Sequence, residues 1–400
     1  MSKLKRFAHN CLVPIGSLLA RFLPDKVPIT FVGVDSTREL CESIAQMQIE
    51  KVLVVTDSVL VELGLVQKVS ECLERSGVAS VTYDGVLPDP TFTQVEQGLT
   101  LLDEHGCQAV LALGGGSPMD ASKLIAAMAT NRVPIEKLEG MMKVKNAPMP
   151  LFAMPTTSGT GSEVTLAAVI SDPVSHKKKF FTDPKLLPLM VALDPSLTLG
   201  LPPAITAATG MDALTHAIES YISKTATETT RGYAKISVKL VFDNLDRACQ
   251  DGKNIETRRA MSLASYYGGL AFTRTSVGYV HAIAHTLGSY YKTPHGLANA
   301  IALPNVLEFS LPACEAQLAE LADDVGIKAE SQSRKAKEFI AAIRQLMKRI
   351  AIPFSLEDLR PQDIPAIAQQ ALAEAHLNYP VPRYMLQGEC EALLHQILSD

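Results

Sequence analysis

The sequence lacks the features that stabilise many secreted proteins. Its seven cysteines are scattered and odd in number, and no two of them form a Cys-x-x-Cys pair. This usage is typical of a reducing compartment, and it argues against a disulfide framework and against a thiolate zinc site. We therefore expect a cytoplasmic protein.

Clusters of positive charge are also scarce. The chain has 37 Lys and Arg against 42 Asp and Glu, a formal net charge of −5, and no basic block beyond Lys177–Lys179. This distribution argues against nucleic acid as a main partner. No apolar run approaches the roughly 20 residues of a membrane span, so we also expect no membrane partner.

An apolar run near the N-terminus extends from Cys11 to Leu23 and follows several basic residues. Pro14 and Gly16 interrupt the run, Arg21 adds a charge to it, and no small-x-small cleavage site follows. These interruptions favour an amphipathic leader that packs on the body of the protein over a signal peptide.

The length predicts two domains, because 400 residues exceed what one core usually holds. In the first half, short apolar segments such as Lys51–Thr56 alternate with helical patterns. This alternation predicts a doubly wound α/β layer around a parallel sheet. After residue 200, long patterns of period 3.6 predict an all-helical second half. We place the two domains at residues 1–200 and 201–400.

A glycine-rich loop follows one predicted strand. The segment Gly114-Gly-Gly-Ser-Pro-Met-Asp120 comes directly after the strand Ala109–Leu113 and opens a helix. Glycines let the backbone approach a ligand, and the free N–H groups of a helix start favour phosphate. Ser117 is a good N-cap, with Pro118 at the first helical position. The alternative is a tight strand–helix turn that binds nothing.

Two further segments could contact a nucleotide. Asp57 follows a buried strand, where a carboxylate could accept from the ribose hydroxyls of a dinucleotide or could simply cap a helix. Segment Pro155–Glu163 is dense in hydroxyls and glycines, which fits phosphate or nicotinamide contacts or a polar loop. No Gly-x-Gly-x-x-Gly follows the first strand, so the pattern is not the usual Rossmann fingerprint.

Potential metal ligands fall into two short windows. Asp212 and His216 are four residues apart in a helical pattern, which stacks them on one helix face as a buried pair or half a metal site. His281 and His285 repeat this spacing, and His295 follows at a Pro/Gly turn. Together the windows predict a metal site. Imidazole and carboxylate ligands suit Fe(II), Zn, Mn or Co.

Several long motifs resemble those of the iron-containing alcohol dehydrogenases. They are Gly-Met-Asp-Ala-Leu-Thr-His-Ala-Ile-Glu (210–219), Gly-Tyr-Val-His-Ala-Ile-Ala-His-Thr-Leu-Gly (278–288), Thr-Pro-His-Gly (293–296), Gly-Gly-Gly-Ser-Pro-x-Asp and Pro-Thr-Thr-x-Gly-Thr. The resemblance extends over residues 28 to 390. It implies a dehydroquinate synthase-like fold, with an N-terminal dinucleotide-binding α/β domain, an all-helical C-terminal domain and an active site between them.

The resemblance also implies roles for individual residues. The metal ligands would be Asp212, His216, His281 and His295. His285 would lie beside the metal and near the nicotinamide. Because it is offset by one helical turn from His281, we also expect it to pass a proton toward solvent. The cofactor contacts would come from Asp57, Gly115, Gly116, Ser117, Asp120, Thr156, Thr157, Thr160 and Lys178, and Phe272 would line the substrate pocket.

The implied activity is reversible hydride transfer between NAD and a primary alcohol, diol or hydroxy acid, with Fe(II) or alternatively Zn(II). Alternatives are a zinc-dependent polyol dehydrogenase, a dehydroquinate-synthase-like lyase and a non-catalytic nucleotide-binding metal protein. The resemblance implies a homodimer or larger assembly, through the early edge strand near Thr30–Gly33.

This chain departs from the family pattern at two places. Asp89 stands between two prolines where relatives often have Asn. Thr273-Arg274-Thr275 stands where relatives usually have small or amide residues. Arg274 could engage a substrate carboxylate or form an outward salt bridge.

Overall fold

The computed structural model describes residues 26–174 and 177–399. The expected N-terminal leader lies outside these residues. The chain divides into two compact units: an N-terminal unit that ends at Gly200 and a helical unit that begins at Leu201.

A parallel six-stranded sheet forms the centre of the N-terminal unit. Its strand order is β1-β9-β6-β4-β2-β3. The strands are β1 (Ile29–Val32), β2 (Lys51–Val55), β3 (Ala79–Tyr83), β4 (Ala109–Gly114), β6 (Leu151–Pro155) and β9 (Met190–Leu193). Every residue of β4 and β6 is buried, as expected for strands covered on both faces.

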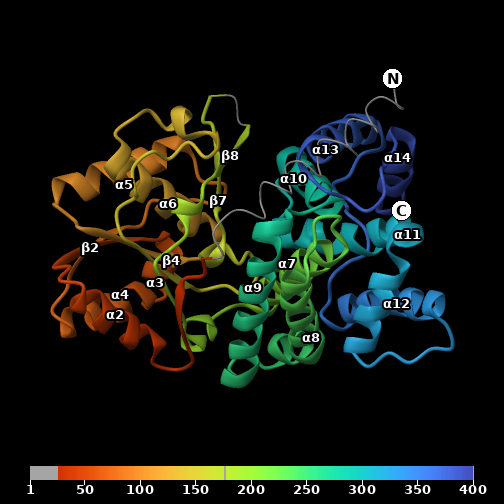
Figure 1. The fold of residues 1–400 in the computed structure, drawn as a ribbon, viewed down its shortest axis with the longest axis horizontal. Helices are drawn as coiled ribbons and strands as arrows, with labels where there is room; N and C mark the ends of the chain where they lie inside the picture. Colours follow the sequence, from red (N-terminus) through yellow and green to blue (C-terminus); the bar gives the residue numbers. More distant parts are fainter. Residues whose placement is uncertain (1–25, 175–176, 400) are drawn as a thin grey trace. The chain divides into compact units, whose positions relative to one another are not determined.

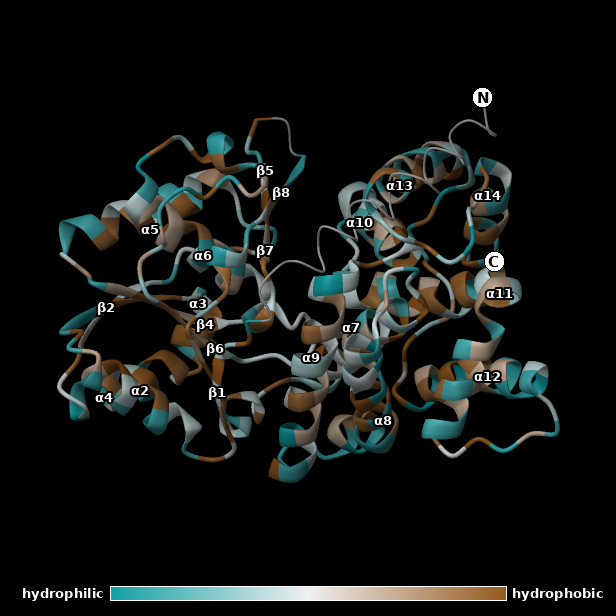
Figure 2. Cartoon of the chain, viewed as in Figure 1, coloured by the Kyte–Doolittle hydropathy of each residue, from teal (hydrophilic) through white to brown (hydrophobic). Residues whose placement is uncertain are grey.

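Helices cover both faces of this sheet. They are α2 (Ser36–Gln46), α3 (Ser58–Glu62), α4 (Leu65–Arg75), α5 (Phe92–Glu104) and α6 (Gly116–Asn131). Helices α2 and α4 lie on one side of the strands, and α5 and α6 lie on the other (Figure 1). The strands are mostly brown in Figure 2, whereas α2 and α4 alternate between brown and teal. This arrangement confirms the predicted doubly wound α/β layer.

A small second sheet, which the sequence reading did not predict, joins the N-terminal unit. It has the order β5-β8-β7 and consists of β5 (Gly140–Met141), β7 (Ala167–Ser171) and β8 (Lys178–Thr182). Strands β7 and β8 are antiparallel. Short 3₁₀ turns cover Ile135–Leu138, Ser162–Val164, Pro184–Leu186 and Pro195–Thr198. Strand β5 precedes the predicted hydroxyl-rich loop Pro155–Glu163 in the chain, and β7 and β8 follow it.

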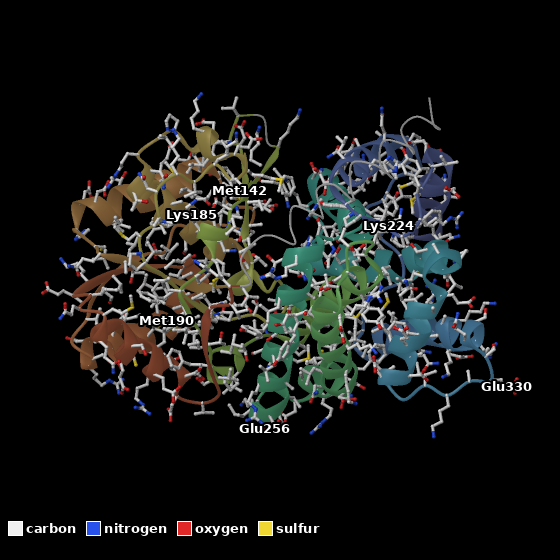
Figure 3. The ribbon with its side chains drawn as sticks, viewed as in Figure 1. Met142, Lys185, Met190, Lys224, Glu256 and Glu330 are labelled. Atoms are coloured by element: carbon white, nitrogen blue, oxygen red, sulfur yellow. The ribbon has the colours of Figure 1, made fainter. Side chains whose placement is uncertain are left out.

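The described part of the helical unit consists of helices around one apolar core. They are α7 (Pro203–Ile222), α8 (Glu228–Gln250), α9 (Ile255–Thr275), α10 (Tyr279–Tyr291), α11 (His295–Asp324), α12 (Gln332–Arg349), α13 (Ile364–Asn378) and α14 (Gln387–Gln396), with a 3₁₀ turn at Pro361–Asp363. Glu256, labelled in Figure 3, lies in the first turn of α9, where a negative charge interacts favourably with the helix dipole. The all-helical prediction is confirmed.

Helix α11 is long and apolar enough to cross a membrane by length and composition alone. However, 67% of its most apolar window is buried inside the protein, as in the core helices of soluble enzymes. Pro304 and Pro312 lie within it, and Cys314 departs from helical geometry. The helix therefore bends where proline removes backbone hydrogen bonds.

Candidate metal centre and nucleotide loops

Helix α7 presents an acid and a histidine on one buried face. Pro203 occupies the first turn of this helix, where its missing N–H costs nothing. Asp212 and His216 follow one turn apart, and His216 Nδ1 lies 3.9 Å from Asp212 Oδ1. Both residues are at most 5% exposed. The ring of Phe272, from α9, stacks on His216 with centroids 4.1 Å apart.

Two other helices bring histidines to the same carboxylate. His281 Nε2, from α10, lies 3.6 Å from Asp212 Oδ1. His295 Nε2, at the start of α11, lies 3.5 Å from the same oxygen. Gly296 permits this approach, because a Cβ there would lie 2.3 Å from the carbonyl oxygen of Ala208 on α7. We call Asp212, His216, His281 and His295 the histidine cluster.

The geometry of the histidine cluster fits a metal ion. One ligand atom each from Asp212, His216 and His281 lie within 4.8 Å of one another. His281 Nε2 is buried and has no hydrogen-bond partner among the described residues. A buried ring nitrogen without a partner is costly, and a cation at this point would use its lone pair. The imidazole and carboxylate donors match Fe(II) or Zn(II).

The electrostatics of the cluster point the same way. Burial by itself would raise the pKa of the Asp212 carboxyl, but the charges of His216, His295 and His281 hold that pKa well below its usual range. Burial lowers the pKa of His281, whereas the nearby carboxylates of Asp212 and Glu219 raise it, with a net result of about 9. Asp212 is therefore ionised at neutral pH, and it provides a negative charge for a cation.

The first nucleotide loop lies where β4 meets α6. Gly115 is the N-cap and Gly116 begins the helix. Ser117 thus lies within the first turn, so its predicted place as N-cap was wrong. The backbone itself makes the turn, and the cap has no side-chain hydrogen bond. The first N–H groups of this 16-residue helix have no intrahelical partner, and an anion site at this helix start stays a prediction.

The hydroxyl-rich loop packs directly on these glycines. A Cβ added to Gly115 would lie 3.2 Å from Thr157 Oγ1, and one added to Gly116 would lie 2.9 Å from Thr160 Cγ2. The adjacent strands explain this contact, because Gly114 at the end of β4 pairs with Pro155 at the end of β6. Thr156 is buried, and its N–H donates to the Gly114 carbonyl.

Asp57 lies at the same carboxyl edge of the sheet. Strand β2, which precedes it, neighbours β4, with Val55 opposite Ala112. The Asp57 carboxylate accepts from the Leu60 N–H at 3.1 Å and caps α3. Only one of its oxygens makes this bond, so capping and a ribose contact are compatible.

The carboxylate of Asp120 is committed to the protein itself. Oδ1 accepts from Ser162 Oγ at 2.7 Å, and Oδ2 accepts from the Val169 N–H at 2.9 Å. Buried Lys123 lies 3.8 Å from Asp120 and donates to Ser162 Oγ, Thr165 Oγ1 and the Ala167 carbonyl at 2.8, 2.8 and 2.6 Å. We call Asp120, Lys123, Ser162 and Thr165 the lysine network. It ties α6 to the hydroxyl-rich loop.

Lys178 does not stand alone in the structure. Its Nζ forms an ion pair with Asp89 Oδ1 at 3.0 Å. Asp89 has a left-handed backbone, with φ of 55°, a conformation that Asp and Asn tolerate better than most residues. The two positions that the sequence singled out separately are therefore direct partners.

Comparisons with known proteins show the family of the chain. The model of the iron-containing alcohol dehydrogenases matches residues 28–195, and the C-terminal model of the same family matches residues 206–398. The chain belongs to the iron-containing alcohol dehydrogenases. The family resemblance seen in the sequence is thereby confirmed.

Individual relatives cover most of the chain. Lactaldehyde reductase of Escherichia coli K12 is 37% identical over 85% of this chain and 90% of its own length. Alcohol dehydrogenase 4 of Saccharomyces cerevisiae YJM789 is 38% identical over 88% of this chain and 93% of its own length. The structure of a 1,3-propanediol oxidoreductase superposes with a TM-score of 0.90, at 37% identity over 93% of this chain and 98% of that one. The structure of a sulfoacetaldehyde reductase from Bifidobacterium kashiwanohense in complex with NAD⁺ gives a TM-score of 0.85. It is 29% identical, and the match covers 94% of this chain and 98% of that one.

Family membership makes this chain a metal-dependent oxidoreductase that interconverts alcohols with aldehydes or ketones, and Fe(II) and NAD are the cofactors of the family. The zinc-dependent polyol alternative is not favoured. The donor set of the histidine cluster is consistent with the iron of the family name.

Sequence reasoning missed two carboxylates beside the histidines. Glu219, on α7, contacts His281 Nδ1 at 2.6 Å. Glu374, on α13, contacts His285 Nδ1 at 2.7 Å and accepts from the Tyr379 hydroxyl at 2.5 Å. Glu219 could have been found, because it lies three residues after His216 on the same helix face. Glu374 carries no local signal, since 89 residues separate it from His285.

His285 extends the cluster by one ring. It stacks on His295 with centroids 5.2 Å apart and meets His281 edge-on at 6.1 Å. Burial raises the pKa of Glu374, but the positive charge and hydrogen bond of His285 lower it below its ordinary value. The ionised carboxylate accepts from Nδ1–H, so in the neutral form of the His285 ring the lone pair is on Nε2.

Proposed function

We propose that the histidine cluster holds Fe(II) through Asp212, His216, His281 and His295, and that this chain uses it to oxidise a primary alcohol, diol or hydroxy acid with NAD, or to reduce the corresponding aldehyde or ketone. One observation carries the proposal: three histidines converge on one buried carboxylate, and His281 Nε2 has no other partner among the described residues. In this assignment residues 201–400 form the metal domain.

We assign NAD to residues 1–200, the dinucleotide-binding domain. The pyrophosphate would lie at the N-terminus of α6, bound by the N–H groups of Gly115, Gly116 and Ser117. Thr157 and Thr160 pack on these glycines and offer hydroxyls to the same phosphates. Asp57 would accept from the adenosine ribose and repel a 2′-phosphate. Asp120 would act through the shape of the loop, since both of its oxygens are already bonded.

The protein's own residues position the substrate and move its proton. When bound, the ion supplies Lewis acidity, which stabilises negative charge that develops on the substrate oxygen. NAD provides the hydride acceptor. Phe272, stacked on His216, offers an apolar wall to the substrate carbon chain. His285 takes the hydroxyl proton at Nε2, while Glu374 stabilises the positive charge from Nδ1.

A histidine substitution separates metal binding from nucleotide binding. His216→Ala should abolish metal retention and turnover and leave NADH binding intact, because His216 and the loops lie in different units. Elemental analysis of anaerobically purified protein and NADH fluorescence titration measure the two properties. The matched control is His395→Ala, at an exposed position on α14. Full metal content in His216→Ala would contradict the ligand assignment.

A substrate panel tests the catalytic part of the proposal. Primary alcohols, diols and hydroxy acids are assayed with Fe(II) and then with Zn(II) by NADH absorbance. Turnover with at least one alcohol is expected, with Fe(II) preferred. If metal and NAD bind but no substrate is turned over, the non-catalytic alternative holds instead.

We further propose a cytoplasmic homodimer or larger assembly. Strand β1 lies at the edge of the sheet and pairs only with β9 among the described strands. Its residues Ile29 and Val32 are 60% and 46% exposed, and an apolar edge strand of this kind favours pairing with another chain. Light scattering after gel filtration of wild type and Ile29→Lys tests this, with a shift of the variant toward monomer expected.

A further inference from the structure

The Glu219 carboxylate is held in one orientation by three donors. Oε1 accepts from the Val280 N–H at 2.8 Å. Oε2 accepts from the Gly278 N–H at 2.8 Å and contacts His281 Nδ1 at 2.6 Å. The side chain is only 3% exposed. Two backbone bonds at the start of α10 therefore fix the carboxylate before it meets the imidazole.

This contact determines which nitrogen of His281 carries a hydrogen. Both Glu219 oxygens already accept from backbone N–H groups, so Nδ1 is the donor in this contact. The lone pair of the neutral ring is then on Nε2, the atom that lies 3.6 Å from Asp212 Oδ1 and has no hydrogen-bond partner among the described residues. A carboxylate that accepts from Nδ1–H also makes Nε2 a more basic ligand for a cation.

The neighbouring backbone is shaped around this carboxylate. A Cβ on Gly278 would lie 2.6 Å from Glu219 Oε1 and 3.1 Å from its carboxyl carbon. The Glu219 carboxylate and a side chain at position 278 could not both occupy this space. Gly278 therefore permits the close approach that joins α7 to the start of α10.

We propose that Glu219 is a positioning residue for the metal: it selects the His281 tautomer that presents the Nε2 lone pair to the ion. The inference rests on the proposed ligand set. A helix cap alone would need only the two backbone bonds. The third bond, to the ring of a proposed ligand, is the one that bears on metal affinity.

Glu219→Gln tests the tautomer with little change in shape. The amide oxygen at the Oε1 position still accepts from the Val280 N–H. The NH₂ group at the Oε2 position donates to Nδ1, which moves the ring hydrogen to Nε2, and it no longer accepts from the Gly278 N–H. We expect about a 10–100-fold loss of affinity for Zn(II) or Co(II) in chelator competition, without substrate or NAD. The visible spectrum of the Co(II) protein should also change, which loss of a helix cap would not cause.

Controls separate this inference from the ligand assignment. Glu374→Gln makes the same change beside His285, which is not a proposed ligand, and should keep wild-type metal affinity. Glu219→Asp keeps a carboxylate and should recover part of the affinity, and it replaces the Gln variant if that protein does not fold. Apo-protein unfolding of each variant shows how much of any loss reflects stability.

The outcomes are distinct. If wild type binds one ion, His216→Ala binds none and Glu219→Gln binds as wild type, the Glu219 inference is overturned and the metal site stands. An affinity loss that apo-protein unfolding fully explains also overturns it. If wild type itself binds no ion, the proposed metal site fails first.

Discussion

The lysine network and the histidine cluster both bury charge, yet they differ in what remains unpaired. Lys123 has three N–H donors, and all three are used, by Ser162, Thr165 and the Ala167 carbonyl. Both oxygens of Asp120 are bonded as well. The bonds of both side chains go to other groups of the protein, so the network holds α6 to the hydroxyl-rich loop and is a structural tie.

The histidine cluster is left incomplete by comparison. Rings from α7, α10 and α11 surround the Asp212 carboxylate, and His281 Nε2 and Asn299 Oδ1 are buried without a hydrogen-bond partner among the described residues. The comparison teaches that buried charge does not by itself mark a binding site. Asp212 Oδ1 already accepts from the Asn299 amide at 2.7 Å. The better criterion is therefore a buried lone pair that no described neighbour uses, here that of His281 Nε2.

Removal of the cation from the lysine network should have the largest effect on stability. Lys123→Met leaves Asp120 and the buried Glu163 without their counter-charge, and the loss of one partner from a buried pair costs about 3–5 kcal/mol. Metal content should not change. Urea unfolding and elemental analysis measure the two properties, with exposed Lys68→Met as control. A loss below about 1 kcal/mol would mean that the network is not a structural tie.

The pH dependence of stability should show the cost of ionising a buried carboxyl group, Glu163, in the same region. Burial raises the pKa of Glu163 from 4.5 to about 7. The folded state then binds the proton more tightly than the unfolded state, so the free energy of unfolding falls as pH rises from 4.5 to 7, by about 3 kcal/mol. Glu163→Gln should remove this slope. Parallel curves for wild type and variant in urea titrations would contradict the expectation.

A smaller effect is expected where the cluster meets His285. Glu374→Gln removes the negative charge that orients Nδ1–H, so kcat should fall about tenfold through weaker proton transfer. Metal content should stay at the wild-type level. Steady-state kinetics across pH, compared with Tyr379→Phe, measure the effect. An unchanged kcat would leave Glu374 without a part in proton transfer.

The smallest effect is expected at the partly exposed pair of Lys178 and Asp89 in the N-terminal unit. Asp89→Asn removes the partner of Lys178, and exposed ion pairs contribute about 0–1 kcal/mol to stability. Lys178 would then be available to a cofactor phosphate, and NADH affinity should rise about two- to threefold, equivalent to about 0.5 kcal/mol. Fluorescence titration at low and high salt measures it. Weaker NADH binding would show that Asp89 itself supports the site.

Local sequence predicted much of this enzyme. The apolar strand Lys51–Val55 and the glycine loop after β4 are short-range patterns, and the structure contains both. Local rules were less reliable at helix starts. The sequence places the cap at Ser117, whereas the N-cap is Gly115. A Cβ there would lie 3.2 Å from Thr157 Oγ1, a contact across the loops that no local rule contains.

The proposed metal ligands likewise combine local spacing with long-range contacts. The four-residue spacings of Asp212 with His216, and of His281 with His285, follow from helix geometry and are legible in the chain. The partners of these side chains are not, since Glu219 meets His281 across 62 residues and Lys123 meets Thr165 across 42. Spacing along a helix determines which groups share a face. Packing between helices and loops determines which of them are satisfied, and therefore which remain available to a cation.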